Sequence, residues 1–356
     1  MMDARWKQLG DLLVNYSTEV KEGERVMIAM KEKDTLPLVR SVYAAAIKAG
    51  AYVQVQFLSD VLSHELLLHG SPEQISWVPE IEKFGMEWAD VYFGIRGAHN
   101  LNEFWDVDAA RLSSLRQAMG KISALRDRTR WCLTPVPTEA MAVQSGTDYD
   151  SLMEMFFRAC LRDWRTERAK WKKLAERFNQ ACSLRLIGRE TDLSFSIENM
   201  RWAVDAGEVN MPGGEIWTAP VASSVNGNIY FEFPGVLGGR LVKDIRLEWR
   251  NGVLVHASAS SHEDFLHQVL RMDAGASLLG EFAFGTNSAV DRWCNDILLD
   301  EKIGGTVHVA LGRAYAEVGG SNFSALHWDI IKDTRKEGAV FLDGEKVFEN
   351  GSFLID

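Results

Sequence analysis

The sequence predicts two domains: an N-terminal α/β domain with a parallel sheet, and a C-terminal β-rich α+β domain. In residues 1–150, short alternating runs are separated by segments of helical spacing, which is typical of a parallel sheet with crossover helices. After Gly188, alternating runs are joined by Asn-Gly and Asp-Gly pairs, which indicate antiparallel hairpins. A length of 356 residues also exceeds the usual size of one domain.

The N-terminal elements follow from the spacing of apolar residues. Apolar side chains three or four positions apart predict helices, and alternation with β-branched residues predicts strands. Gly50 stands where the second helix should end. The elements expected in this domain are helices over 6–16 and 37–49 and strands over 25–29, 51–58 and 89–95.

Connecting helices are expected over residues 151–185. Trp164 and Phe178 belong to one apolar stripe on an otherwise polar segment, which favours packing against a core. The remaining residues, 186–356, form the predicted β-rich metal-binding catalytic domain, with one helix expected over 263–273.

Charge and composition argue against nucleic acids and membranes as binding partners. Lys and Arg number 39 against 50 Asp and Glu, and the net charge of -11 repels phosphate backbones and anionic lipids. The basic residues of 158–177 alternate with acidic ones, so we interpret them as a solvated helix face. The four cysteines lack CxxC spacing, and neither a secretory signal nor an apolar run of about 18 residues occurs. We therefore expect a cytoplasmic protein that binds neither nucleic acid nor membrane.

Two histidines stand in settings that favour metal binding. His308 lies in a short apolar run that predicts a strand, and His327 precedes Asp329 by two positions. A spacing of two places both side chains on one face of a strand, where an imidazole and a carboxylate can bind a metal together. His262 and His267 are five residues apart, whereas the HExxH zinc motif needs four, so a zinc site there is not favoured.

Two acidic residues upstream strengthen the metal hypothesis. Glu215 follows a Pro-Gly-Gly turn, whose flexible backbone lets a side chain approach a site closely. Glu281 stands alone in an apolar run between two glycines, and a buried carboxylate is costly unless it is paired or bound to metal.

Four motifs occur in a set order along the second half of the chain: NMPGGEIWTAP at 210–220, GEFAFG at 280–285, HVALG at 308–312 with Tyr315 after it, and HWD at 327–329. In order and spacing they resemble the thermophilic-aminopeptidase family of metallopeptidases, that of aminopeptidases T and S. The N-terminal half is similar as well, through LVNYS and VKEGE. The resemblance therefore covers nearly the whole chain.

The resemblance implies a dimer that encloses its active sites and a centre of two divalent ions (zinc, cobalt or manganese). Tyr315 and Glu215 are then the expected catalytic residues. Only 11 residues separate Tyr315 from His327, fewer than in longer members, which leaves the substrate preference open. The implied metal ligands are Glu215, Glu281, His308, His327 and Asp329.

The charges of these five residues favour two ions over one. Three carboxylates with two neutral imidazoles carry -3, so one divalent ion leaves -1 and two leave +1, which suits a bridging hydroxide. Such a centre activates water and polarises a scissile carbonyl. We therefore expect an aminopeptidase that releases N-terminal amino acids from peptides, with Tyr315 donating a hydrogen bond to the oxyanion.

Two other functions fit the same residues. The scaffold also resembles the 2,5-dihydroxypyridine ring-cleaving dioxygenases, in which His308, His327 and Asp329 would bind one ferrous ion and the substrate would be a small aromatic molecule. Glu215 and Glu281 would then lie outside the ligand set. A non-catalytic protein stabilised by metal is less favoured, because structural sites rarely gather five potential ligands.

Overall fold

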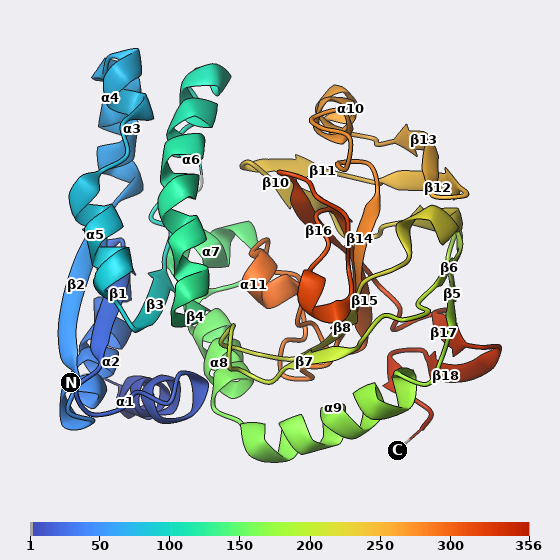
Figure 1. Ribbon diagram of the computed structural model, residues 1–356, viewed down its shortest axis with the longest axis horizontal. Helices are drawn as coiled ribbons and strands as arrows, with labels where there is room; N and C mark the ends of the chain where they lie inside the picture. Colours follow the sequence, from blue (N-terminus) through green and yellow to red (C-terminus); the bar gives the residue numbers. More distant parts are fainter. Residues whose placement is uncertain (1–2, 101, 356) are drawn as a thin grey trace. The chain divides into compact units, whose positions relative to one another are not determined.

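The computed structural model describes residues 3–100 and 102–355. Two compact units divide the chain: Met1–Leu161 with Gly207–Pro212, and Arg162–Ala206 with Gly213–Asp356 (Figure 1). The first unit contains a parallel sheet with helices, and the second consists mainly of antiparallel strands. The predicted fold class is therefore confirmed. Within the described ranges, no helix has the length and apolar character needed to cross a membrane.

The sheet of the first unit has the order β2-β1-β3-β4, and all its strands are parallel. Its centre is buried because β1 carries Val26 and Ile28, whose side chains have no exposed surface. Asp90, just before β3, binds Arg25 at the start of β1. The strands are β1 (Arg25–Lys31), β2 (Tyr52–Leu58), β3 (Val91–Arg96) and β4 (Arg130–Pro135).

Helices connect these strands, as the spacing predicts. Side chains of Ser71, Asp108 and Asp148 cap three of them by accepting hydrogen bonds from backbone N–H groups. The expected helix over 6–16 continues into a π-helical turn. The helices are α1 (Ala4–Leu12), η1 (Leu13–Ser17), η2 (Lys33–Thr35), α2 (Leu36–Lys48), α3 (Asp60–His69), α4 (Pro72–Ser76), α5 (Glu80–Trp88), α6 (Ala109–Ser123), η3 (Ala124–Arg128), α7 (Glu139–Gln144) and α8 (Tyr149–Cys160).

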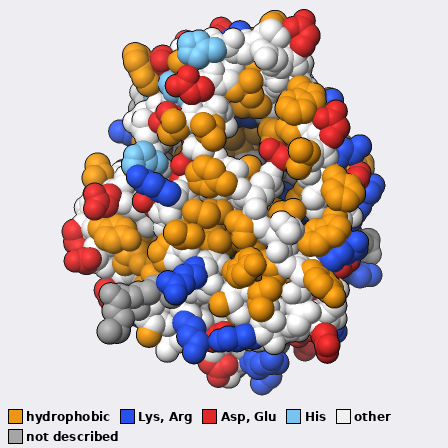
Figure 2. Space-filling view, turned by 90° about the vertical axis from the view of Figure 1, so that its left-hand side faces the viewer, with side chains coloured by type: hydrophobic (Ala, Val, Ile, Leu, Met, Phe, Trp, Pro, Cys, Tyr) orange, Lys and Arg blue, Asp and Glu red, His pale blue; other side chains and the backbone are white. Residues whose placement is uncertain are grey.

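β2 lies at an edge of the sheet and leaves large apolar side chains exposed. Tyr52 and Phe57 on β2 are 68% and 53% exposed, and Tyr43 and Ile47 on α2 are 41% and 48% exposed. Figure 2, which looks at the side on which β2 and α2 lie, shows hydrophobic side chains gathered on this face.

The second unit contains an eight-stranded antiparallel sheet in the order β13-β12-β9-β6-β5-β17-β18-β19. The predicted Asn-Gly turn is present: Asn251 and Gly252 have φ of 48° and 76° and join β12 to β13. The strands are β5 (Ser183–Gly188), β6 (Thr191–Ser196), β9 (Asn226–Tyr230), β12 (Arg246–Arg250), β13 (Val253–Ser258), β17 (Ala339–Leu342), β18 (Glu345–Glu349) and β19 (Ser352–Phe353).

A five-stranded sheet in the order β16-β15-β14-β8-β7 completes the second unit, together with the hairpin β10-β11. The five strands are β7 (Ala203–Asp205), β8 (Glu215–Thr218), β14 (Leu279–Gly285), β15 (Thr306–Gly312) and β16 (His327–Lys332). The other elements are α9 (Trp164–Phe178), η4 (Ala222–Ser224), β10 (Gly235–Leu237), β11 (Arg240–Val242), α10 (Glu263–Leu270), α11 (Ile297–Asp300) and η5 (Ala316–Val318).

One face of β14 packs into an aromatic core. The ring of Phe284 lies 5.8 Å from that of Trp202 and 5.2 Å from that of Phe348, and Phe282 is fully buried beside it. Because side chains alternate along a strand, Glu281 points to the opposite face. The aromatic core thereby fixes the strand that carries a candidate ligand.

Candidate metal centre

Four adjacent strands of the five-stranded sheet bring the five predicted ligands together. Glu215 begins β8, Glu281 lies on β14, His308 on β15, and His327 and Asp329 on β16. Ligand atoms of Glu215, Glu281 and His308 lie within 4.8 Å of one another, as do those of Glu281, His327 and Asp329. Glu281 therefore belongs to both groups.

The distances show how Glu281 stands between the two imidazoles. Its Oε1 lies 3.4 Å from Nε2 of His308, and its Oε2 lies 3.6 Å from Nε2 of His327. Oε1 of Glu215 is 2.9 Å from Nε2 of His308, and Oδ1 of Asp329 is 3.4 Å from Nε2 of His327. Each imidazole thus faces two carboxylates.

A β-bulge lies just before Glu281. The pairing of β14 with β15 is regular from Glu281 onward, so Glu281 lies opposite Ala310, and the bulge at Gly280 shifts only the pairing of Leu279. The side chain of Glu281 projects to the same face of the sheet as its partner Ala310. A Cβ atom at position 280 would lie 2.4 Å from the carbonyl oxygen of Gly312, so the bulge requires glycine.

The imidazole of His327 is oriented by the backbone. Its Nδ1 lies 2.9 Å from the carbonyl oxygen of Arg313, which can only accept, so Nδ1 donates. Nε2 is thereby left without a proton in the neutral ring and faces the carboxylates. This is the arrangement in which histidine usually binds metal.

Three further charged residues lie beside the five, and sequence reasoning missed them. Nζ of Lys302 lies 2.5 Å from Oε2 of Glu215, 2.8 Å from Oε1 of Glu301 and 3.5 Å from Oδ2 of Asp205. Lys302 is fully buried. In the sequence, Glu301 and Lys302 follow a short apolar run in the manner of a solvated turn, so only the fold reveals their position.

Burial and neighbouring charges both shift the pKa values of these groups. Burial would raise the pKa of Glu215, but the charge of Lys302 and the contact with His308 outweigh it and hold that pKa well below its usual range. Glu281 has no lysine beside it, and burial, together with the charges of Glu215 and Asp329, outweighs the contact with His308 and raises the pKa of Glu281. Burial lowers the pKa of His327, but the charge of Asp329 reverses this and raises it to about 10.

Tyr315 is half-buried at the edge of the cluster. Its ring lies 5.0 Å from that of His327 and 5.4 Å from that of Trp217. Burial, followed by the negative charges of Glu281 and Asp329, raises the pKa of Tyr315 to about 12, so the phenol keeps its proton at neutral pH.

The short loop between Tyr315 and His327 is tied to the sheet by one amide. Nδ2 of Asn322 donates hydrogen bonds to the carbonyl oxygens of Gly312 and Gly275, at 2.6 Å and 2.9 Å. The loop is therefore held at the end of β15, next to the strands that carry the cluster.

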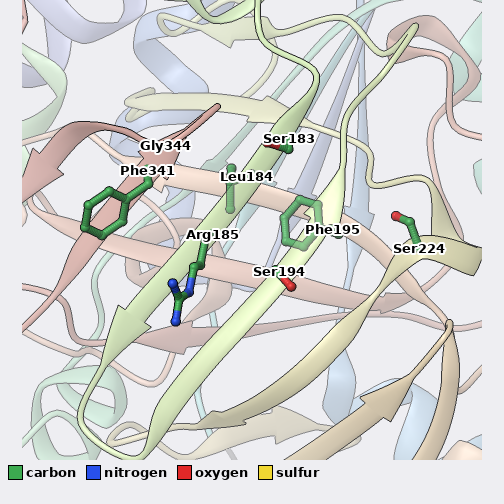
Figure 3. A pocket seen from close by; sticks show the side chains of 8 residues that line it. All are labelled: Ser183, Leu184, Arg185, Ser194, Phe195, Ser224, Phe341 and Gly344. Atoms are coloured by element: carbon green, nitrogen blue, oxygen red, sulfur yellow. The ribbon is translucent and has the colours of Figure 1, made fainter.

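A hollow of about 530 Å³ lies elsewhere in the second unit, over β5, β6 and β17 (Figure 3). Its lining includes Ser183, Arg185, Ser194 and Phe341. None of the five converging residues lines it. The hollow is thus separate from the candidate metal centre.

The five residues fit a divalent metal. Nε2 of His308 and Oδ1 of Asp329 are buried and make no hydrogen bond, although carboxylate or imidazole atoms lie close to both. Ligand atoms about 2.1 Å from one ion, at tetrahedral or octahedral angles, lie about 3.0 to 3.4 Å apart. The contacts between the donor atoms here, 2.9 to 3.6 Å, span that range.

A family of metallopeptidases matches nearly the whole chain. Residues 2–353 match the family model of the thermophilic metalloproteases (M29). The chain belongs to this family. The resemblance to the thermophilic-aminopeptidase family and the predicted class of enzyme, a metallo-aminopeptidase, are confirmed.

Individual relatives agree with this membership. The chain is similar to aminopeptidase 2 of Geobacillus stearothermophilus, with 25% identity over 87% of this chain and 85% of the relative. It is also similar to aminopeptidase PepS of Streptococcus thermophilus, with 24% identity over 97% and 96% of the two chains.

Two solved structures share the fold. Wild-type AmpT from Thermus thermophilus matches with a TM-score of 0.88 and 20% identity, covering 99% of both chains. The 2,5-dihydroxypyridine dioxygenase from Pseudomonas putida matches with a TM-score of 0.64 and 14% identity, covering 99% of this chain and 97% of that one. At these identities the likeness establishes the fold alone.

Proposed function

We propose that the protein releases N-terminal amino acids from peptides at a centre of two divalent ions bound by Glu215, Glu281, His308, His327 and Asp329. The observation that carries this proposal is the convergence of three carboxylates and two imidazoles from four adjacent strands, at 2.9 to 3.6 Å. Family membership supports the same function.

Charge supports two ions. Burial raises the pKa of Glu301 to about 8, so this carboxyl keeps its proton at neutral pH. When both imidazoles are neutral, the three carboxylate ligands together with Asp205 and Lys302 carry a formal charge of -3. Two divalent ions would leave +1, which a bound hydroxide would balance, whereas one would leave a buried negative charge uncompensated. The ions are proposed to be zinc, cobalt or manganese, since imidazole and carboxylate suit all three.

The residues of the chain then have separate roles. Bound divalent ions would supply an activated water and polarise the scissile carbonyl. Glu215 presents Oε1 to the cluster, because its other oxygen is bound to Lys302, and we assign it to metal binding and to orienting the reacting water. Tyr315 keeps its phenolic proton and would donate a hydrogen bond to the oxyanion.

We also propose a substrate class, an oligomeric state and a cellular location. The net charge of -11 supports a substrate that is a peptide or another small molecule and not a nucleic acid. The exposed apolar side chains of β2 and α2 support a homodimer. A cytoplasmic location stays a prediction from the sequence.

The ring-cleaving dioxygenase is the second candidate, and the shared fold is what favours it. It would bind one ferrous ion through His308, His327 and Asp329, with Glu215 and Glu281 outside the ligand set. Against it, Nε2 of His308 lies within 3.4 Å of an oxygen of each glutamate, a separation that suits ligands of one ion and supports including both glutamates in the ligand set.

The test is hydrolysis of amino-acid amides and short peptides with a free α-amine, compared with their N-acetylated forms. We expect the free-amine substrates to be cleaved one residue at a time and the acetylated forms to resist, because the amine is proposed to be recognised at the metal centre. His308→Ala should abolish cleavage, whereas His256→Ala, in an exposed strand of the same unit, should not. Equal cleavage of acetylated and free peptides would contradict the aminopeptidase proposal.

A further inference from the structure

We propose that Lys302 is a positioning residue that holds one oxygen of Glu215 and leaves only the other to the metal centre. Its ammonium lies 2.5 Å from Oε2 of Glu215, while Oε1 of the same carboxylate faces Nε2 of His308 at 2.9 Å. The inference rests on the proposed role of Glu215 as a metal ligand.

The surroundings of Lys302 explain why a positive charge is stable there. The side chain has no exposed surface, and an isolated buried ammonium would be strongly destabilising. An ammonium has three N–H donors, and three carboxyl groups surround this one: Glu215, Glu301 and Asp205. The ammonium donates a hydrogen bond to Glu215, and the nearby oxygens of Glu301 and Asp205 stabilise its charge.

The backbone fixes Lys302 relative to the strand of Glu215. Its carbonyl oxygen accepts a hydrogen bond from N–H of Asn287 at 3.0 Å, and the side-chain amide of Asn287 donates to the carbonyl oxygen of Gly213 at 2.9 Å. Gly213 lies two residues before Glu215. The lysine and the carboxylate are thus held by one chain of short contacts.

Two effects of Lys302 on metal binding oppose each other. A positive charge next to a ligand repels a cation, so removing it should strengthen metal binding if charge alone matters. A carboxylate released from its partner can instead rotate away from the geometry that binds the ion, and loss of such supporting contacts weakens metal binding about 10- to 100-fold. The two effects change the affinity in opposite directions.

The experiment measures zinc or cobalt affinity by competition with a chelator, without any assay of activity. Lys302→Met should weaken binding about 10- to 100-fold although it removes a positive charge. Lys302→Gln, which keeps a donor for Glu215 but no charge, should recover part of the loss. Affinity that is unchanged or stronger in Lys302→Met would overturn the proposal, as would equal effects of the Met and Gln variants.

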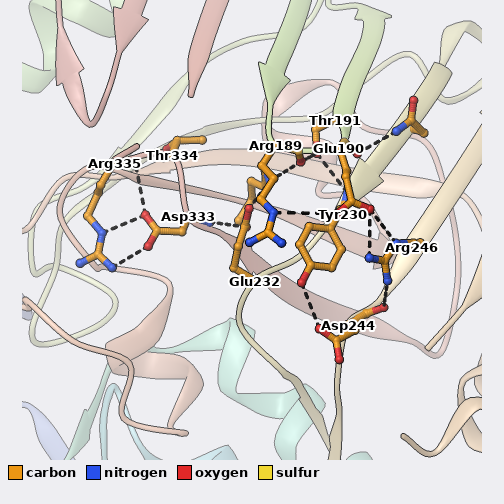
Figure 4. Close-up of polar contacts among 12 residues, drawn as sticks. Arg189, Glu190, Thr191, Tyr230, Glu232, Asp244, Arg246, Asp333, Thr334 and Arg335 are labelled. Carbon is orange, nitrogen blue, oxygen red and sulfur yellow. Dashed lines mark hydrogen bonds and ion pairs between the residues drawn. The ribbon is translucent and has the colours of Figure 1, made fainter. Parts of the chain in front are cut away.

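Lys332 offers a matched control. Lys332 is also fully buried, and its Nζ lies 2.6 Å from Oε1 of Glu232. Figure 4 shows Glu232 among the polar residues around Tyr230 and Asp333. Lys332 comes three residues after Asp329 on β16, so it points to the other face of the sheet. Lys332→Met should leave the metal affinity within about twofold of wild type, since it contacts none of the ligands.

A second variant covers the case in which Lys302→Met does not fold. Lys302→Met combined with Asp205→Asn removes one formal charge of each sign next to the centre, and Asp205 is not among the grouped candidate ligands, so a loss of metal affinity cannot come from net charge. Weaker binding in this variant supports the proposal, and unchanged binding contradicts it. If wild type itself binds no divalent ion, the proposed function fails; if wild type binds metal and the variants bind it equally well, only the role of Lys302 fails.

Discussion

Glu281 and Asp329 lie on either side of Ala310 in one row of the five-stranded sheet, Glu281 on β14 and Asp329 on β16. Directly paired residues project to the same face, so the small methyl group of Ala310 stands between two carboxylates. A larger side chain at this position would occupy the space in which the ligands converge.

Ala310→Leu should therefore abolish metal binding and lower kcat/KM by at least about 10²-fold, since misplacement by 1 Å costs that much. Val309→Leu is the control, because Val309 is also buried but projects to the opposite face. Metal content and kcat/KM, with circular dichroism to verify folding, check this. Full metal content and activity in Ala310→Leu would show that the ions bind elsewhere.

Tyr315→Phe should lower kcat by about 10²- to 10³-fold, the usual effect of removing one oxyanion donor. KM and metal content should change little, because the phenol is not among the proposed ligands. Steady-state kinetics with metal analysis separates the two effects. Tyr230→Phe is the control: it removes a hydroxyl that donates a hydrogen bond to Asp244, away from the ligands, and should leave kcat unchanged. A Tyr315 variant that loses its metal would assign this residue to metal binding.

Asp90→Asn tests a pH-dependent contribution to stability in the first unit. Hydrogen bonds from the side chain and backbone N–H of Arg25 lower the pKa of Asp90 to about 2. A lowered pKa stabilises the folded state above the unfolded value near 4, and the contribution is lost as the pH falls from about 4 to about 2. For this partly exposed bidentate pair we expect about 1 kcal/mol at neutral pH.

Thermal unfolding of wild type and Asp90→Asn between pH 7 and pH 2.5 provides the measurement. The difference in Tm should be largest above pH 5 and should shrink toward pH 2.5. A difference that stays constant over this range would show that the ion pair does not titrate as its geometry indicates.

Much of the fold follows from local patterns. Helical spacing near the N-terminus and the Asn251-Gly252 pair predict elements that the structure contains, because both signals depend on residues close in sequence. The convergence of Glu281, His308 and Asp329 could be expected only by resemblance. Their alignment depends on the pairing of β14, β15 and β16, which joins residues distant in sequence.

Lys302 shows why the rest of the site could not be predicted. Its partners Glu215 and Asp205 are distant in sequence, and a lysine that follows two acidic residues and precedes a Gly-Gly pair by two positions is usually exposed. The pairing of β7 with β8 sets Asp205 opposite Glu215, and the backbone hydrogen bond from Asn287 N–H to the carbonyl oxygen of Lys302 ties the lysine to the chain that follows β14. Long-range contacts of this kind leave no periodic signal.

The metal content of the purified protein, measured per chain, tests the central claim most directly. We predict about two zinc, cobalt or manganese ions per chain. The content should fall in Glu281→Ala, since Glu281 faces both imidazoles, and should stay unchanged in Glu248→Ala, whose side chain pairs with Arg250 instead. One iron ion per chain, unaffected by Glu281→Ala and accompanied by oxygen uptake with a dihydroxylated aromatic substrate, would contradict the two-metal peptidase.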